Sequence, residues 1–356
     1  MAEQDLNRNI NELNEQKIKQ QIENIGYGVM TTSFFHPLSF TRTLMQLGHE
    51  PFPLEKGKVY VFFGRNAYFL PNFYRYLNNF YLSHGFATIF TGVGGHALQT
   101  FLHLSGGFVI SEVFNTKLFF DYFKKILNRY YPEVGGNIED LKNLNNLDNY
   151  QQFRLRLRDG IRKTIQVVLC SVISRPFTVV AIRQIAQLIG NETKYLPINP
   201  FQPLLLIGAE EGPPGLFSGL MPVIVNGLIS VWGTTICIYG VDLAFKKFER
   251  EFQDLEQQER EVMAHSRKSF DYLVPFLVNT LRYPFEVCST VMAVAGSGLL
   301  VSLLPYSPSF KHWSDAYDYL APHELRRGAK FFLREETGSI RVGTDNRLYA
   351  SKKHFI

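Results

Sequence analysis

Long stretches without charged residues dominate the pattern of this chain. From Gly212 to Val241 there is no Asp, Glu, Lys or Arg in thirty consecutive residues, and Asn226, Ser230 and Thr234 recur at every fourth position. A helix that crosses a hydrocarbon core ~30 Å thick needs about 20 apolar residues, so the stretch is long enough. Steps of four place side chains on one helix face. The stretch therefore predicts a membrane-spanning helix with one polar face.

Four further stretches are rich in apolar residues and hold few charged residues or none. They predict spans over residues 22–47, 85–111, 164–189 and 270–295. The apolar run 299–304 is too short to cross a membrane, and the tail from residue 311 holds no stretch near about 20 apolar residues. We therefore expect an all-α membrane protein with five spans.

Polar side chains recur at steps of three or four residues on these spans, which places them on one face of each helix. The main positions are Thr32, His36, Ser39 and Thr43 with Arg42 beside them; His96, Gln99 and His103; Gln166, Cys170, Ser174 and Thr178 with Arg175 and Arg183; and Asn279, Arg282, Glu286 and Ser289. Such stripes either form hydrogen bonds between helices, worth about 0.6–2 kcal/mol each, or line a shared polar interior. Their recurrence on all five spans favours the interior. Arg282 and Glu286 are one turn apart, so they can pair within one helix.

Composition and charge narrow the function classes. The chain has 46% hydrophobic residues and a formal charge of +5, but its basic residues are scattered, which disfavours nucleic-acid binding. The first 21 residues are polar and lack an apolar stretch, so we expect no cleaved targeting signal in them. The three cysteines lack metal-ligand spacing, and we expect buried, reduced thiols.

Catalytic chemistry is not predicted. His96 and His103 invite a proton-relay or metal hypothesis, but spacing assigns no third ligand, so groove polarity is the favoured interpretation. No nucleophile elbow, phosphate-binding loop or metal motif occurs. We therefore expect a protein that is not an enzyme, with no cofactor and no metal.

The pattern recurs in thirds. Pro37, Pro176 and Pro284 lie in the contexts HPLSFTR, RPFTVVAIR and YPFEVCST, and each is expected to kink its span. Glycine turns follow, HGFATIFTG at 84–92, EGPPGLFSG at 211–219 and the weaker RRGAKFF at 326–332. The sequence thus predicts three two-helix repeats, the third without its second helix.

This arrangement resembles the mitochondrial carrier family, whose odd helices carry Pro-x-acid-x-x-base and pair acids with bases of neighbouring repeats to close a gate. Here Ser39 replaces the first acid and Arg42 keeps the base, while Thr178 and Ala181 replace both members in the second repeat. The third keeps Glu286 and has Ser289 in place of the base. No motif holds a complete pair and the sixth helix is missing, so alternating-access transport is not expected.

A closer resemblance is to the mitochondrial carrier homologues of the outer membrane. It rests on QLGHEPFP (46–53), FGR (63–65), RQIAQLIGNETKY (183–195), EEGPPGLFSGLMP (210–222) and the stretch from VMAVAGSGL to PYSP (291–308). It covers the chain from about residue 25 to the tail. The boundaries it suggests are a lead-in at 1–21, repeat one at 22–126, an Asn-rich loop insert at 127–160, repeat two at 161–250, a partial repeat three at 251–335 and a polar tail at 336–356.

The resemblance implies a degenerate carrier bundle in the outer mitochondrial membrane, open to lipid where the sixth helix would lie. Members of this branch insert tail-anchored and other α-helical proteins, and they have been linked to lipid scrambling and to docking of a BH3-type apoptotic protein. An open polar groove lowers the desolvation cost of a crossing polar tail. The expected groove residues are Arg42, His36, Ser39, His96, His103, Ser174, Arg183, Asn226, Ser230, Asn279, Arg282 and Glu286.

One position departs from that branch. Members of the branch often have an acid near the position of Gly227, whereas in this chain only the neighbouring Asn226 is polar. The alternative functions are a docking receptor for BH3-type regulators and a small-molecule carrier. The client proteins, the orientation and the oligomeric state stay open.

Overall fold

The computed structural model describes residues 2–59, 64–115, 149–251, 257–302, 310, 312–321 and 325–350. These residues are mostly helical, and the chain divides into two compact units. The first unit comprises Met1–Ser105, Val172–Pro222 and Pro284–Ile356, and the second comprises Gly106–Ser171 and Val223–Tyr283.

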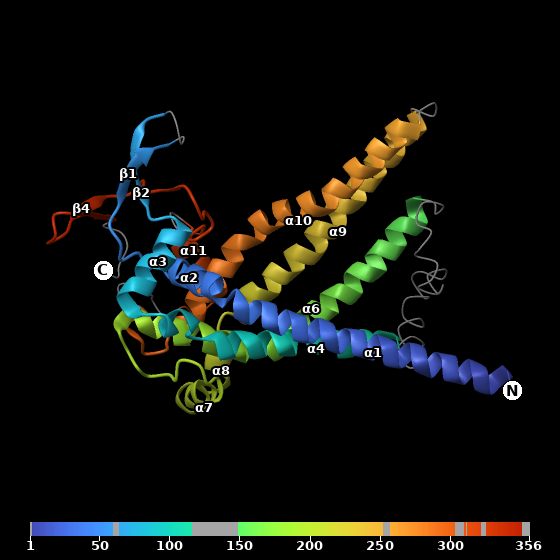
Figure 1. Ribbon diagram of the computed structural model, residues 1–356, viewed down its shortest axis with the longest axis horizontal. Helices are drawn as coiled ribbons and strands as arrows, with labels where there is room; N and C mark the ends of the chain where they lie inside the picture. Colours follow the sequence, from blue (N-terminus) through green and yellow to red (C-terminus); the bar gives the residue numbers. More distant parts are fainter. Residues whose placement is uncertain are drawn as a thin grey trace. The chain divides into compact units, whose positions relative to one another are not determined.

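The long helices follow the predicted apolar stretches (Figure 1). They are α1 (Ala2–Phe34), α2 (His36–Gln46), α4 (Val93–Asn115), α6 (Asn149–Ala186), α9 (Leu220–Glu251) and α10 (Gln257–Val294). The shorter ones are α3 (Phe73–His84), η1 (Ala87–Phe90), η3 (Gln187–Gly190), α7 (Phe201–Glu210), α8 (Gly212–Leu216), η4 (Leu300–Ser302) and α11 (Trp313–Leu320).

Proline acts differently at the three predicted kinks. At Pro37 the helix breaks: α1 ends at Phe34, and Pro37 lies in the first turn of α2, where its missing N–H leaves no helical hydrogen bond unmade. By contrast, α6 and α10 continue as helix through Pro176 and Pro284.

Two segments of the described chain are long and apolar enough to cross a membrane, Asn149–Gly190 and Gly212–Glu249. They contain the third and fourth predicted spans. The first predicted span is interrupted at Phe35, and polar side chains such as His96 and His103 dilute the second. Five spans and the threefold repeat therefore stay predictions.

The core of the first unit forms where α2, α3 and α6 meet. Phe40 of α2 packs edge-on against Phe80 of α3, with ring centroids 5.2 Å apart, and Val179 and Ile185 of α6 belong to the same buried cluster. The Asn72 side chain caps α3 by accepting a hydrogen bond from the Arg75 amide at 2.9 Å. The connector after α2 therefore contains a well-defined helix, α3, whose start is fixed by this cap.

Two small antiparallel sheets were not predicted. One orders β1 (Glu55–Lys58), β2 (Asn66–Leu70) and β3 (Arg334–Glu335), and the other pairs β4 (Ile340–Val342) with β5 (Leu348–Ala350) (Figure 1). The Leu54 amide donates to the Leu348 carbonyl at 2.7 Å. The segment predicted as a polar tail therefore packs onto the connector after α2.

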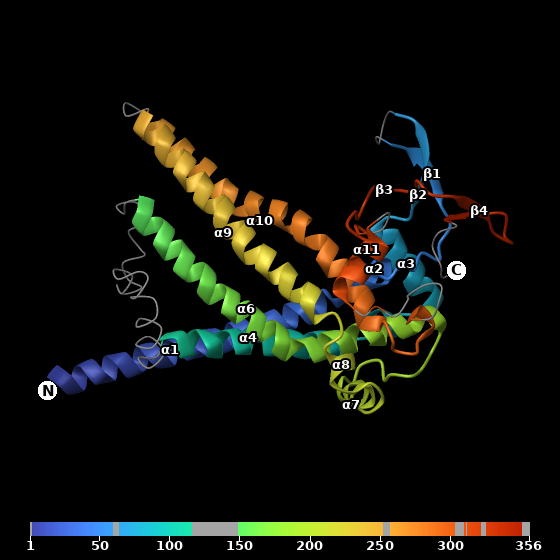
Figure 2. The same cartoon turned by 180° about the vertical axis from the view of Figure 1, so that it is seen from behind.

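The second unit is a bundle of helical segments in which glycines allow close approach. A Cβ on Gly233 of α9 would lie 3.0 Å from Val278 of α10, and one on Gly227 would meet the Val167 side chain of α6. Within this unit α9 and α10 run side by side (Figures 1 and 2). The prediction of a loop through residue 160 is wrong for 149–160, which begin α6. The rest of the predicted insert, 127–148, lies outside the described residues.

Candidate polar site within the predicted spans

An ion pair joins the first and third proline motifs. Arg42 on α2 donates from Nη2 to Oε2 of Glu286 on α10 at 3.0 Å, and the two side chains are 31% and 29% exposed. Gln46 donates from Nε2 to the other carboxylate oxygen of Glu286 at 3.1 Å. Thr290 lies 3.0 Å from Gln46 Oε1. Both oxygens of Glu286 therefore have partners, and the pair remains reachable from outside.

The pairing of Arg282 with Glu286 that their spacing allows does not form. Arg282 Nε instead donates to Asn279 Oδ1 at 2.8 Å, one turn earlier on α10. The base that Glu286 takes is 244 positions away. The chain thus keeps one acid–base contact between motifs, although no single motif holds a complete pair.

Two histidines connect α2 to α4. His36 Nε2 lies 2.8 Å from the Thr91 carbonyl, and its Nδ1 lies 3.2 Å from Nδ1 of His96. A carbonyl only accepts, so the network assigns the His36 proton to Nε2 and makes His96 the donor at Nδ1. Thr32 and Thr100 add a hydroxyl contact of 3.3 Å. At these contacts the polar stripe forms hydrogen bonds between helices.

Arg175 and Arg183 are the largest fully buried side chains, 1% and 0% exposed. Arg175 Nε donates to the Ser218 carbonyl at 2.8 Å and its Nη2 to the Ser289 carbonyl at 3.1 Å. Arg183 donates from both terminal nitrogens to the carboxylate of Glu211, and from Nε to the Ala293 carbonyl at 2.8 Å. They brace α6 against the turn before α9 and against the end of α10.

The turns before α4 and α9 have the same construction. Each is bounded by two glycines with positive φ, Gly85 and Gly92 (φ 86° and 87°) in one and Gly212 and Gly219 (φ 68° and 67°) in the other. A Cβ on Gly219 would lie 2.8 Å from the Ser289 carbonyl oxygen. The predicted glycine turns are therefore sites where the backbone requires glycine.

Each turn is also held from the preceding proline motif. His36, before Pro37, bonds the carbonyl that precedes Gly92, and Arg175, before Pro176, bonds the carbonyl that precedes Gly219. An imidazole in one motif and a guanidinium group in the other thus bind the equivalent backbone carbonyl of each turn.

The remaining predicted groove residues are dispersed. Ser174 is buried on α6, and its carbonyl accepts from Thr178 at 3.2 Å. The half-buried ones are Ser39 on α2, His103 on α4, Asn226 and Ser230 on α9, and Asn279 and Arg282 on α10. The structure brings together Arg42 with Glu286, His36 with His96, and Asn279 with Arg282. A single groove lined by the whole set stays a prediction.

The sequence did not predict a buried ion pair that involves Glu50 of the motif QLGHEPFP. Glu50 binds Arg334 of β3, both buried, and Arg334 Nη1 also donates to the Pro71 carbonyl at 3.0 Å. The Tyr76 hydroxyl donates to the His49 carbonyl at 2.8 Å. Burial, with a smaller contribution from His84, lowers the pKa of His49 to about 4. The only sequence signal was the motif itself.

Comparison with known proteins shows which proteins this chain resembles in sequence. No protein-family model matches it. Mitochondrial carrier homolog 1 of Mus musculus is 26% identical over 329 residues, which cover 88% of this chain and 77% of that protein. Mitochondrial carrier homolog 2 is 27% identical in Mus musculus over 319 residues and in Homo sapiens over 314, in both cases covering 87% of this chain and 92% of the relative. The chain is homologous to these proteins over about 87% of its length, which supports a relationship to the mitochondrial carrier homologue family.

Proposed function

We propose that this protein is an insertase of the outer mitochondrial membrane for tail-anchored and other α-helical membrane proteins. The chain is homologous to proteins named mitochondrial carrier homologs, and these names support a location in a mitochondrial membrane. The outer membrane, the multi-pass topology and the clients are part of the proposal.

The observation that carries the proposal is the partly exposed Arg42–Glu286 pair. Its residues lie on segments predicted to be in the membrane, where charged side chains are costly and are functional candidates. The pair offers a donor and an acceptor at one point, so the polar end of a client exchanges water for protein partners there. This lowers the desolvation barrier to crossing.

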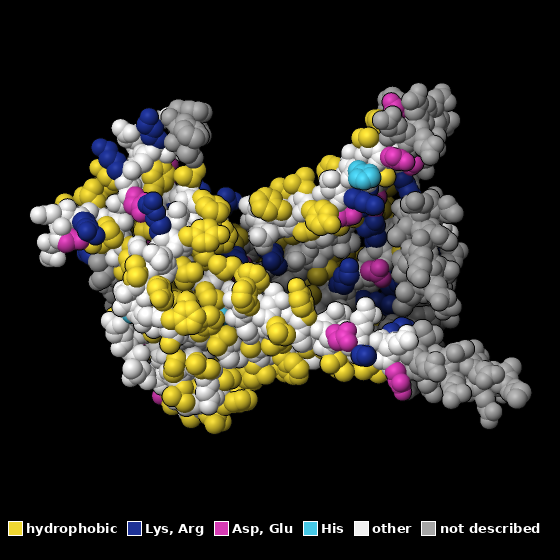
Figure 3. Space-filling model, in the orientation of Figure 1, with side chains coloured by type: hydrophobic (Ala, Val, Ile, Leu, Met, Phe, Trp, Pro, Cys, Tyr) yellow, Lys and Arg dark blue, Asp and Glu magenta, His cyan; other side chains and the backbone are white. Residues whose placement is uncertain are grey.

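Exposed apolar side chains supply the second half of the mechanism. On α10, Tyr272, Phe276 and Leu281 are exposed while Val274 and Val278 are buried, and hydrophobic side chains follow this helix in Figure 3. In the Gly212–Glu249 segment, 6% of the most apolar window is buried. Such surfaces fit lipid contact, and the apolar helix of a client leaves into the same lipid. Passage of lipid headgroups, and so scrambling, would accompany insertion.

A small-molecule carrier is the second candidate. The Arg42–Glu286 pair joins the base of the first proline motif to the acid of the third, which is the kind of contact that the resemblance to carriers assigns to a gate. This reading requires a sixth helix supplied by a partner or by a second copy. Solute uptake into vesicles that contain the protein alone would support it over insertion.

The test of the proposal is insertion into liposomes that hold the purified protein. A labelled tail-anchored substrate is added, and protease-protected product is compared with empty liposomes. The proposal predicts a protein-dependent increase. A folded protein that gives no increase, but retains a BH3-type peptide on the vesicle, would replace the insertase with a docking receptor.

A further inference from the structure

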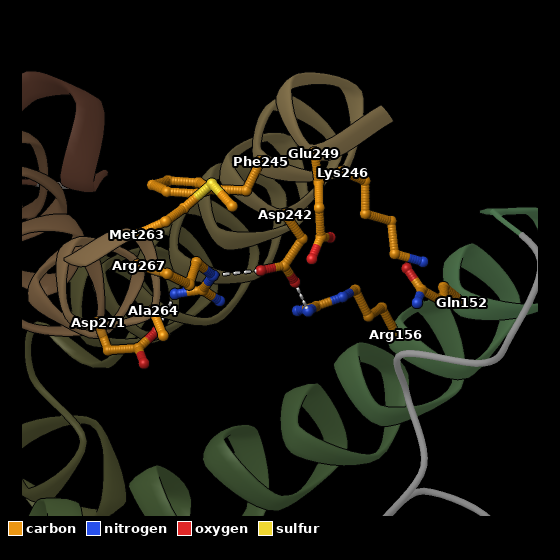
Figure 4. Close-up of a pocket in the computed structure, with 10 residues that line it drawn as sticks. All are labelled: Gln152, Arg156, Asp242, Phe245, Lys246, Glu249, Met263, Ala264, Arg267 and Asp271. Atoms are coloured by element: carbon orange, nitrogen blue, oxygen red, sulfur yellow. Dashed lines mark hydrogen bonds and ion pairs between the residues drawn. The ribbon is translucent and has the colours of Figure 1, made fainter. Parts of the chain in front are cut away.

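The second unit contains a cavity of about 420 Å³ formed by α6, α9 and α10 (Figure 4). Sites for small ligands commonly measure about 300–1,000 Å³. None of the residues that line the cavity is among those predicted for the groove. Its charged lining comprises three bases and three acids, Arg156, Lys246, Arg267, Asp242, Glu249 and Asp271.

Asp242 fixes two guanidinium groups at the cavity wall. One carboxylate oxygen accepts from Arg156 of α6, and the other accepts from Nε of Arg267 of α10 at 2.5 Å. Arg267 is further held by Nη1, which donates to Asp271 at 2.7 Å. Three helices thus hold these groups in place without using all of their N–H donors, and Arg156 Nε is buried with no hydrogen-bond partner.

Glu249 supplies an acid that this network does not use. It lies on α9, two turns after Asp242, and its carboxylate is directed toward the space between Asp242 and Arg156 (Figure 4). None of the hydrogen bonds or ion pairs of the described residues involves Glu249. Phe245 and Met263 provide an apolar wall. The cavity therefore presents N–H donors, a carboxylate and an apolar surface together.

The position of the cavity relates it to the membrane. Gln152 and Arg156 are in the first turns of the candidate span Asn149–Gly190, and Asp242 and Glu249 are in the last turns of the candidate span Gly212–Glu249. If both segments cross the bilayer, these turns lie at its polar boundary, where phospholipid headgroups are found.

We propose that this cavity binds a zwitterionic phosphate ester, the chemistry of a phosphocholine or phosphoethanolamine headgroup. The phosphate accepts hydrogen bonds from Arg156 and Arg267, since planar guanidinium groups suit phosphate oxygens. The ammonium group lies against the Glu249 carboxylate. Equal numbers of acids and bases in the lining favour a zwitterion over a simple anion or cation. The proposal rests on the membrane location of the proposed function and is independent of insertase activity.

The test uses the full chain in phospholipid-free detergent micelles. Glycerophosphocholine, phosphoethanolamine and inorganic phosphate are titrated by calorimetry. We expect both zwitterions to bind, and Glu249→Gln to weaken them by about tenfold or more, because a hydrogen bond or contact to a charged group is lost. The matched control is Glu251→Gln on the same helix, whose exposed side chain pairs with Lys247 away from the cavity lining; its affinities should equal those of the wild type.

A second arm separates the two sources of this chemistry. In nanodiscs, immobilised spin-labelled phosphatidylcholine that is lost in Glu249→Gln and kept in Glu251→Gln identifies a lipid headgroup site. Soluble binding without this lipid signal identifies a site for a free zwitterion. Binding of inorganic phosphate alone, equal affinities in Glu249→Gln and wild type, or no binding by folded protein in any arm would overturn the proposal. Insertion measured on the same samples shows whether the proposed function fails separately.

Discussion

Arg183 and Glu211 show how a charged residue in an apolar segment is stabilised. Arg183 is completely buried, and its partner Glu211 is 20% exposed. Removing one partner of a buried ion pair leaves an uncompensated charge, which costs about 3–5 kcal/mol. The buried arginine is therefore a structural brace whose loss affects stability first.

We predict that Glu211→Gln lowers the stability of the detergent-solubilised protein by about 3 kcal/mol, measured as a fall in Tm. The adjacent Glu210→Gln is the matched control, because Glu210 is 43% exposed and pairs with Lys194 at the surface. Exposed pairs contribute about 0–1 kcal/mol. Equal Tm values for the two variants would contradict the structural role of Arg183.

His49 makes stability depend on pH. Its folded pKa, about 4, is below the ordinary value of 6.5. The unfolded chain therefore binds the proton more tightly, and this contribution to stability is complete above pH 6.5 and is lost as pH falls toward 4. The loss approaches about 3 kcal/mol, because each pH unit between the two pKa values contributes about 1.4 kcal/mol.

The measurement is Tm at a series of pH values for wild type and His49→Gln, which carries no titrating group. We expect the wild type to lose more stability between pH 6.5 and 4. Parallel curves for the two proteins would show that His49 is not buried in its neutral form.

At the residue scale, the sequence identified which charges are unusual but not what they contact. Arg42 and Glu286 were recognised as the surviving members of incomplete motifs, yet their pairing spans 244 positions. Arg183 was predicted to line the groove, whereas its guanidinium group is completely buried and paired with Glu211. Partners of this kind are set by tertiary packing, which local spacing does not encode.

At the element scale, α9 depends on glycine at its contacts. A Cβ on Gly227 would overlap Val167 of α6, whereas a Cβ on Gly240 meets no atom within 4 Å. We predict that Gly227→Ala destabilises the second unit by about 1–3 kcal/mol through overpacking, while Gly240→Ala is neutral or slightly stabilising through helix propensity.

Thermal unfolding of both variants tests this contact. If Gly227→Ala were as stable as Gly240→Ala, the close approach of α6 and α9 would be wrong. An aspartate at position 227, the acid expected from the family branch, would require more space than alanine. The close approach of α9 to Val167 of α6 therefore accounts for glycine at position 227.

Helices were predictable from the sequence where an apolar stretch is at least as long as a membrane span, as in α6 and α9. The break at Phe35 follows from Pro37, but its sharpness does not. The short strands were not predicted because two to five residues give too little alternation. Their partners are also distant, since β2 pairs with β3 more than 260 positions later. The helical start of α6 at Asn149 was hidden by its polar composition.

At the scale of the whole molecule, the C-terminal segment is part of the fold. Arg334 binds Glu50, and the Phe331 carbonyl accepts from the Phe73 amide at 2.8 Å. The connector after α2 and the residues after α11 therefore stabilise each other. This explains why the loop motif QLGHEPFP carries a buried acid so close to a predicted span.

The central claim is that the Arg42–Glu286 pair serves the polar end of an inserting client. The most direct measurement is protease-protected insertion of a tail-anchored substrate into liposomes containing wild type, Arg42→Glu or Arg65→Glu. Arg65 is the matched control because it is 73% exposed and pairs with Glu335 outside the predicted spans. All proteins are first required to show a wild-type Tm, with Arg42→Gln used if Arg42→Glu does not fold.

We predict that wild type and Arg65→Glu insert the substrate well above empty liposomes. The Arg42 variant should fall toward the level of empty liposomes, because like charges at positions 42 and 286 no longer present a donor to the client. Insertion by the folded Arg42 variant at the wild-type rate, or no insertion by the wild type, would contradict the account.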